Sequence, residues 1–243
     1  MADWFILLNG TRQLLTGGGY ADGFYSPPYV ALLLAPFAWL PDIVVIIAYY
    51  VLAFAAAAYV CYKLKLSPWQ VAAVASSPPV IYVFGHGNLE PFVLLGAFLP
   101  AWAGLPLLAM KPQVGGGLIV YILYRRIVEK RGLADFVPLA ILCAVSFAIC
   151  PTWPMEALGA TGTSWNLSFW PHSLIVGLPL LFYGIRKQDR LIALAASAFL
   201  TPYVGPQNLM AVLPLVAREA PVTLFMYLAV WLGYMLARGL IGM

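Results

Sequence analysis

The chain has few ionisable side chains, so each can be considered as a candidate for chemistry. Only 9% of its 243 residues are Asp, Glu, Lys or Arg, and it has two histidines, His86 and His172. Lys111 stands inside an apolar segment, where a charge costs about 2.5–3.5 kcal/mol in a bilayer. It is either a functional cation or a side chain that reaches an interface at the break made by Pro112. Asp3, near the first residue, fits a helix N-cap.

Other polar and aromatic residues allow two interpretations each. Glu90 begins a helical run after a glycine and an asparagine, which favours a role in capping. A histidine in a loop is often structural, and His86 lies in a short polar interruption between two apolar runs. Aromatic rings stack on sugars but are also enriched at bilayer interfaces. They gather in one loop of this sequence: Trp153, Trp165, Phe169 and Trp170.

Composition places the chain in a membrane. Apolar residues make up 63% of it, whereas a soluble domain has about 45–50% apolar and about 25% charged residues. A water-soluble monomeric enzyme is therefore excluded, and so are a disordered chain and a disulfide scaffold. The three cysteines lie in apolar runs without CxxC spacing and no carboxylates cluster, so neither a metal site nor a cofactor is predicted.

Apolar runs separated by prolines and polar breaks predict an all-α, polytopic membrane helical bundle. Crossing a bilayer takes about 20 residues, and several runs fall short, which indicates short or broken helices. About ten apolar segments are predicted: Ser26–Leu40, Ile43–Tyr62, Pro68–Phe84, Leu89–Ala103, Leu105–Tyr124, Leu133–Cys150, Ser173–Ile185, Leu191–Val204, Leu209–Val216 and Val222–Ile241.

Positive charges in the loops predict the orientation. Lys and Arg residues occur in the loops around 125–131, 186–190 and 218, and we expect these loops to be cytoplasmic. The net charge of +4 is spread over these loops, which indicates orientation rather than nucleic-acid binding. Lys63 and Lys65 count against this topology, although long side chains can reach either interface.

The predicted organisation is one transmembrane domain over residues 1–243. It comprises an extracytoplasmic N-terminal stretch (1–25), membrane helices (26–150 and 173–243) and an extracytoplasmic loop (151–172). Within the first stretch, residues 4–15 form an amphipathic pattern that ends at Gly17-Gly18-Gly19. Such a helix is expected to lie in the membrane interface.

Several motifs, taken in order, resemble the GT-C class of polyprenyl-phosphate-sugar glycosyltransferases, and glycosyltransferase family 87 in particular. The first is the run from Asp3 through the glycines to Tyr20, followed by Ser-Pro-Pro-Tyr and Ala-Pro-Phe-Ala-Trp-Leu-Pro. The others follow along the chain: GNLEPFVLLGAFLPAWAGLPLLAMKPQ (Gly87–Gln113), Asn166-Leu167-Ser168 and LTPYVGPQN (Leu200–Asn208).

This resemblance implies sugar transfer from a lipid-linked donor. Asp3 matches the loop aspartate that removes a proton from the acceptor hydroxyl, and Lys111 and then Arg12 are the candidates to stabilise the leaving phosphate. The donor is a polyprenyl-phosphate sugar, mannose-like, and the acceptor a glycolipid or glycan on the extracytoplasmic face of the cell membrane. The other implied substrate-binding residues are Tyr20, Asn166, His172, Gln207 and Asn208.

Two departures from the family pattern keep other functions open. The family's first transmembrane helix is expected to be missing, because Asp3 is only two residues from the first residue. Gln207 and Asn208 stand where the pattern commonly has histidine. Both features would also fit a non-catalytic structural subunit of a larger membrane complex. A transporter is a third alternative, since carriers use broken helices, but no internal repeat is evident.

Overall fold

The computed structural model describes residues 1–21, 23–162, 166–219, 222 and 229, and this part of the chain is helical with no strand. The N-terminal half contains eight α-helices and one 3-10 turn: α1 (Ala2–Leu15), α2 (Tyr29–Leu34), η1 (Ala35–Phe37), α3 (Asp42–Leu64), α4 (Pro68–Ala75), α5 (Pro78–His86), α6 (Glu90–Gly96), α7 (Ala101–Leu108) and α8 (Pro112–Val128). The remaining elements are η2 (Ala134–Phe136), α9 (Val137–Ile149), α10 (Trp153–Leu158), η3 (Gly159–Gly162), α11 (Leu174–Lys187), α12 (Arg190–Ala196), η4 (Ser197–Phe199), η5 (Pro206–Ala211) and α13 (Leu213–Arg218). The all-α prediction is confirmed for the described residues.

One described helix is long and apolar enough to cross a membrane. This is α3, whose 23 residues have a mean hydropathy of 2.4 and are 28% buried over the most apolar window. Asp42 in its first turn favours the positive end of the helix dipole, and Lys65 ends it in a left-handed conformation (φ 54°). The predicted segment Ile43–Tyr62 is therefore one uninterrupted helix.

Other predicted segments are divided where the sequence has proline. Pro68–Phe84 forms α4 and α5, because Pro78 begins a new helix after Ser77. Leu89–Ala103 is divided at Pro100 between α6 and α7. Proline lacks the N–H that continues a helix but fits its first turn, so it starts helices here instead of extending them. The apolar runs thus form more helices than the number of segments predicted, and these helices are shorter than the segments. The predicted Val222–Ile241 segment lies outside the described residues apart from 222 and 229.

The N-terminal helix exists, but its surroundings differ from the prediction. Its apolar residues Trp4, Leu7 and Leu8 are buried in the main hydrophobic core. This part of the apolar face, which was expected to rest on lipid, is covered by protein, whereas Leu15 at the end of the helix is exposed. Asp3 is not the N-cap, since Met1 takes that position and gives no side-chain hydrogen bond; Asp3 instead lies within the first turn.

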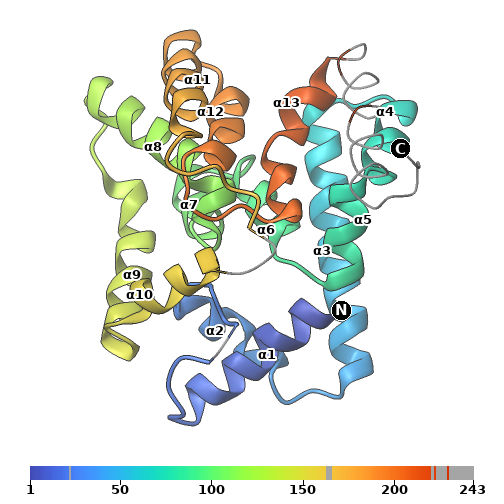
Figure 1. Ribbon diagram of the computed structural model, residues 1–243, viewed down its shortest axis with the longest axis vertical. Helices are drawn as coiled ribbons and strands as arrows, with labels where there is room; N and C mark the ends of the chain where they lie inside the picture. The colour runs from blue at the N-terminus through green and yellow to red at the C-terminus, as the bar shows by residue number, and fades with distance from the viewer. Residues whose placement is uncertain (22, 163–165, 220–221, 223–228, 230–243) are drawn as a thin grey trace.

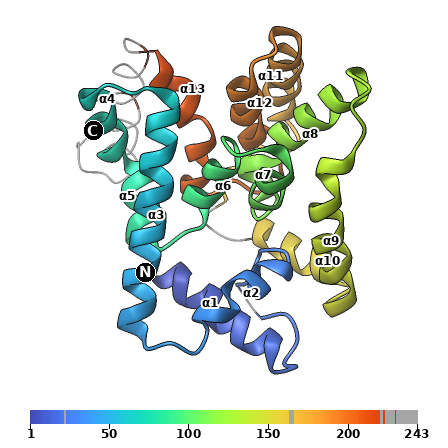
Figure 2. The same ribbon diagram turned by 180° about the vertical axis from the view of Figure 1, so that it is seen from behind.

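Figures 1 and 2 show how these helices enclose the centre of the molecule. α1 and α2 close one end, α3 and α5 form one side, and α8 and α9 lie on the other, with α6 and α7 between them. α11 packs on α12, and α12 packs on α8. The loop from α5 to α6, the start of α1 and the start of α8 therefore meet in the interior.

The crossing of α8 and α12 depends on a glycine. A Cβ atom on Gly117 would collide with the carbonyl oxygen of Ala193, while one on Gly116 would meet nothing within 4 Å. The Gly117 N–H also donates to the Ser197 hydroxyl at 2.9 Å. Small residues permit such close approach of helix backbones.

We expect Gly117→Ala to destabilise the protein by about 1–3 kcal/mol, because the added methyl forces α8 and α12 apart. Gly116→Ala is the matched control, since it makes the same chemical change one residue away in open space. Thermal unfolding in detergent should show a lower melting temperature for the first variant alone. Equal melting temperatures would contradict the close crossing.

Candidate functional site

A chain of polar side chains connects α1 to α8 through the loop after α5. Gly87 ends α5 with a positive φ of 78°, and a Cβ there would lie 2.6 Å from the Cβ of Trp4. This turn presents the buried Asn88 to α1, and the Asn88 Nδ2 donates to Asp3 Oδ2 at 2.6 Å. On its other side, Asn88 Oδ1 accepts from Lys111 Nζ at 2.9 Å. Because the ammonium can only donate, Lys111 determines which end of the Asn88 amide faces Asp3.

Lys111 is also paired with a fully buried carboxylate. Its Nζ lies 2.8 Å from Glu90 Oε1, and the two side chains are 12% and 0% exposed. The same Glu90 oxygen accepts from Asn208 Nδ2 at 3.2 Å. Glu90 Oε2 is buried without a hydrogen-bond partner among the described residues. Five side chains, from Asp3, Asn88, Glu90, Lys111 and Asn208, thus form one polar network.

The charges of the network determine what Lys111 can do. Lys111 forms an ion pair with Glu90 and reaches Asp3 only through the Asn88 amide, so its charge is already balanced by Glu90. A buried ion pair of this kind is strongly destabilised when either partner is removed. Two of the three N–H groups of Lys111 are used by Asn88 and Glu90, which leaves one to donate to a ligand.

The late turn that provides Asn208 is held by its own hydrogen bonds. Asn208 Oδ1 accepts from the Gly205 N–H at 2.6 Å, which fixes the amide with its Nδ2 toward Glu90. Next to it, Gln207 is buried, and its Oε1 has no partner among the described residues.

Asn166 stabilises the late turn by hydrogen bonds to its backbone and makes no hydrogen bond with the network. Its Nδ2 donates to the carbonyls of Pro202 at 3.0 Å and Thr161 at 3.1 Å. Its Oδ1 accepts from the N–H groups of Ser168 at 2.9 Å and Val204 at 3.1 Å. The amide thereby uses its full hydrogen-bonding capacity, so Asn166 holds the backbone of the late turn and the preceding loop in position.

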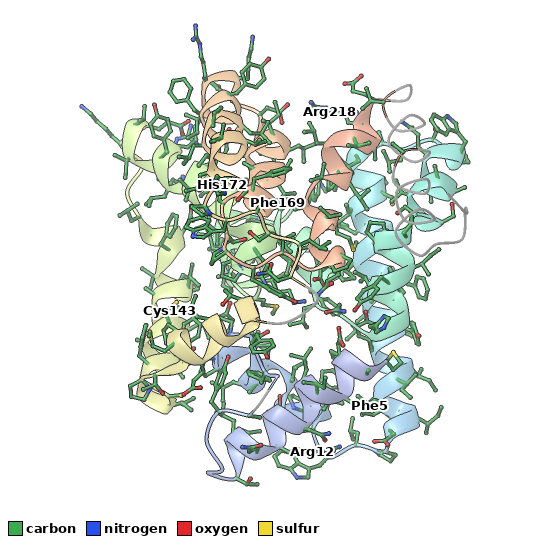
Figure 3. The ribbon with its side chains drawn as sticks, viewed as in Figure 1. Phe5, Arg12, Cys143, Phe169, His172 and Arg218 are labelled. Carbon is green, nitrogen blue, oxygen red and sulfur yellow. The ribbon has the colours of Figure 1, made fainter. Side chains whose placement is uncertain are left out.

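Three other residues predicted to bind substrate lie apart from the network. The Arg12 guanidinium donates to the Ala38 carbonyl and to Asn9 Oδ1, and the Tyr20 hydroxyl donates to the Ser26 carbonyl at 2.8 Å. His172 is exposed, in the loop before α11. Figure 3 shows Arg12 on α1 at one end of the molecule and His172 well away from it. The structure therefore brings together Asp3, Lys111 and Asn208, with Gln207 adjacent.

Two members of the network were missed by the sequence analysis. Asn88 was not considered as a site residue, and the capping role expected for Glu90 is wrong, because its carboxylate reaches Lys111 and Asn208 and makes no cap. A signal was present: Asn88 and Glu90 are two polar residues in an otherwise apolar stretch, with a single opposite charge 21 residues later. Within the described ranges, no three His, Cys, Asp or Glu side chains lie close enough to hold a metal ion.

The fold and the site together define an all-helical protein with an apolar exterior and a carboxylate–cation network inside. The family model of glycosyltransferase family 87 matches residues 24–240, so the chain belongs to glycosyltransferase family 87. It is a membrane-associated glycosyltransferase. The matched range includes Lys111, Gln207 and Asn208 and begins after Asp3. No curated protein and no solved structure matched the chain.

Proposed function

We propose that this protein is a multi-pass enzyme of the cell membrane that transfers a mannose-like sugar from a polyprenyl-phosphate donor to a glycolipid or glycan acceptor on the extracytoplasmic face. Asp3 is the general base in this mechanism. The observation that carries the proposal is the chain Asp3–Asn88–Lys111, which joins a carboxylate and a cation from distant parts of the sequence.

The geometry of Asp3 suits a base. Asn88 occupies Oδ2, and Oδ1 has no hydrogen-bond partner among the described residues. The side chain is half-buried, so an acceptor hydroxyl could approach it while much of the solvent is excluded. As the hydroxyl oxygen attacks the anomeric carbon, its proton passes to Oδ1 and the bond from that carbon to the phosphate oxygen breaks.

The leaving phosphate would accept a hydrogen bond from Lys111. The remaining N–H of Lys111 is the cationic donor of the network, and such donors stabilise negative charge that develops in the transition state. The Glu90 carboxylate neutralises the charge of the Lys111 ammonium, so we expect Lys111 to bind the phosphate less tightly than an unpaired lysine would.

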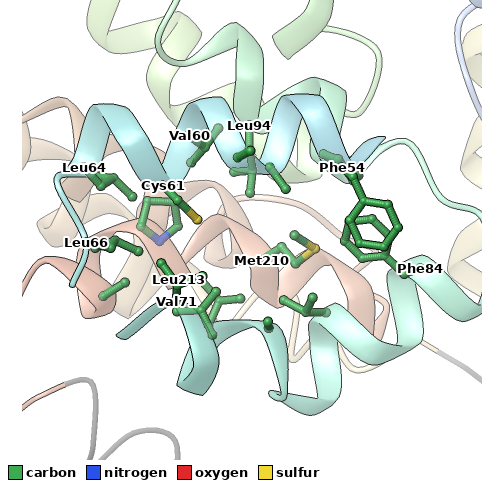
Figure 4. A pocket seen from close by; sticks show the side chains of 18 of the residues that line it. Phe54, Val60, Cys61, Leu64, Leu66, Val71, Phe84, Leu94, Met210 and Leu213 are labelled. Carbon is green, nitrogen blue, oxygen red and sulfur yellow. The ribbon is translucent and has the colours of Figure 1, made fainter. Parts of the chain in front are cut away.

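An apolar cavity next to the network suits the lipid part of a donor. It has a volume of about 660 Å³ and lies between α3, α4, α5, α6 and α13. Figure 4 shows its lining, which includes Phe54, Val60, Leu94, Met210 and Leu213. Pro91, adjacent to Glu90, also lines it. A polyprenyl chain bound there would have its phosphate end near the polar network.

Membranes from cells that express the full chain test the donor. We expect radiolabelled mannose to pass from polyprenyl-phosphate mannose to a membrane glycolipid or glycan, and not from a nucleotide-linked mannose when synthesis of the lipid-linked donor is blocked. Membranes from cells without the protein serve as the control. Transfer from the nucleotide sugar under that block would contradict a lipid-linked donor.

A non-catalytic subunit is the second candidate. It is favoured by Asp3 lying outside residues 24–240, the range that matches the family. Purification in mild detergent separates the two possibilities: a structural subunit would copurify with other membrane proteins and transfer no sugar with or without them. An active, isolated chain would exclude this alternative.

A further inference from the structure

A second polar site lies at the other end of α8 from Lys111. The 17 residues of this helix separate the two ends by roughly 25 Å. A hollow of about 350 Å³ opens there between α8, α12 and the junction of α6 with α7. Four arginines line it: Arg125, Arg126, Arg131 and Arg190.

The carboxylates near this hollow do not balance its arginines. Glu129 pairs with Arg125 through Oε1 and with Arg131 through Oε2, the latter at 3.1 Å. Arg126 pairs with Asp135. Four guanidinium groups therefore face two carboxylates, and the hollow carries excess positive charge.

Arg190 is the arginine in the hollow that makes no ion pair with a described residue. Its guanidinium lies over the ring of Phe98, 5.2 Å from the centroid, an arrangement that holds the cation in place. The neighbouring Asp189 does not neutralise it, because that carboxylate caps α12 through Leu191 and Ile192 and binds Arg218 at 2.6 Å. The guanidinium of Arg190 is thus available to an anion.

The rest of the hollow is apolar, which favours a lipid over a free anion as its ligand. Leu99, Leu118 and Ile122 line it, and so do Ala97 and Ala101 at the junction of α6 with α7. A small inorganic anion would leave these surfaces in water, whereas a phospholipid covers them with its glycerol and acyl chains.

We propose that this hollow binds the phosphate headgroup of an anionic glycerophospholipid. Arg190 and Arg125 contact the phosphate, and Leu99 and Ile122 contact the glycerol and the first methylene groups. This site is separate from the one at Asp3 and does not depend on the proposed sugar transfer. It would add a lipid ligand bound at the opposite end of α8.

Native mass spectrometry of the full chain in detergent tests the proposal by titration with phosphatidylglycerol, phosphatidylcholine and inorganic phosphate. We expect one phosphatidylglycerol to bind more tightly than either of the other two. Loss of one charge-assisted contact in Arg190→Gln should weaken it about tenfold. The variant removes no ion pair, so its fold should be retained, and its melting temperature checks this.

Arg186→Gln is the matched control, because Arg186 is an exposed arginine near the end of α11 that does not line the hollow. It should leave phosphatidylglycerol binding unchanged. Equal weakening by both variants would show attraction to general surface charge and overturn the proposal. Phosphatidylcholine binding as tightly as phosphatidylglycerol would do the same, and so would inorganic phosphate binding as tightly as the lipid.

Discussion

Replacing Asp3 with asparagine should reduce sugar transfer by about 10²–10⁴-fold, the range in which a general base contributes to catalysis. Asparagine has nearly the same shape, and its Oδ1 can still accept from Asn88 Nδ2, so the first turn of α1 should be preserved. It cannot take a proton from an acceptor hydroxyl. The measurement is the rate of labelled mannose transfer from polyprenyl-phosphate mannose, with the melting temperature measured in parallel.

Asp42→Asn is the matched control for this experiment. Asp42 also lies in the first turn of a helix, α3, but it is exposed and takes no part in the network. It tests whether loss of a carboxylate at a helix N-terminus is by itself sufficient to lower the rate. If Asp3→Asn folds and transfers sugar at the full rate, Asp3 is not the base, although the glycosyltransferase assignment would stand.

Replacing Lys111 with methionine should destabilise the protein by about 3–5 kcal/mol, the typical loss when one partner of a buried ion pair is removed. Glu90 is 0% exposed, so its carboxylate would remain in the interior without the ammonium. Its Oε2 has no partner among the described residues, and the single bond from Asn208 cannot replace Lys111. Thermal unfolding of the purified protein in detergent measures the effect.

A double variant shows whether Lys111→Met loses stability because Glu90 is left with an unbalanced charge or because packing is lost. Adding Glu90→Gln to Lys111→Met removes the uncompensated charge and keeps an acceptor for Asn208, so most of the lost stability should return. Lys63→Met is the control for lysine removal, since Lys63 is exposed at the end of α3. A single variant as stable as the wild-type protein would contradict a structural role for the Lys111–Glu90 pair.

The helical class was predictable because hydropathy and proline spacing are local properties. Ile43–Tyr62 contains no proline and forms one helix, as expected. The prediction was less successful where local signals competed, as at Ser76-Ser77 before Pro78, where one apolar run becomes two helices. It was wrong about the N-cap at Asp3, because the helix begins at Ala2, two residues earlier than the pattern suggested.

The candidate site was predicted only in part, and the reason is geometric. Asp3, Lys111 and Asn208 were chosen from residue type and family resemblance, and the fold brings them together. Arg12 and Tyr20 carry equally suitable groups, but in the folded chain they donate to the backbone carbonyls of Ala38 and Ser26. Local sequence cannot distinguish these cases, because the choice depends on which backbone oxygens the folded chain brings within reach.

The sequence by itself determined that the chain is helical and apolar, and its ordered motifs indicated a family that the family match confirms. Only the tertiary structure decided that Asn88 joins Asp3 to Lys111 and that Glu90 balances the lysine. These contacts connect residues 85 and 21 positions apart. Hydropathy and helix signals act over a few residues, whereas a contact between distant side chains exists only once the helices have packed.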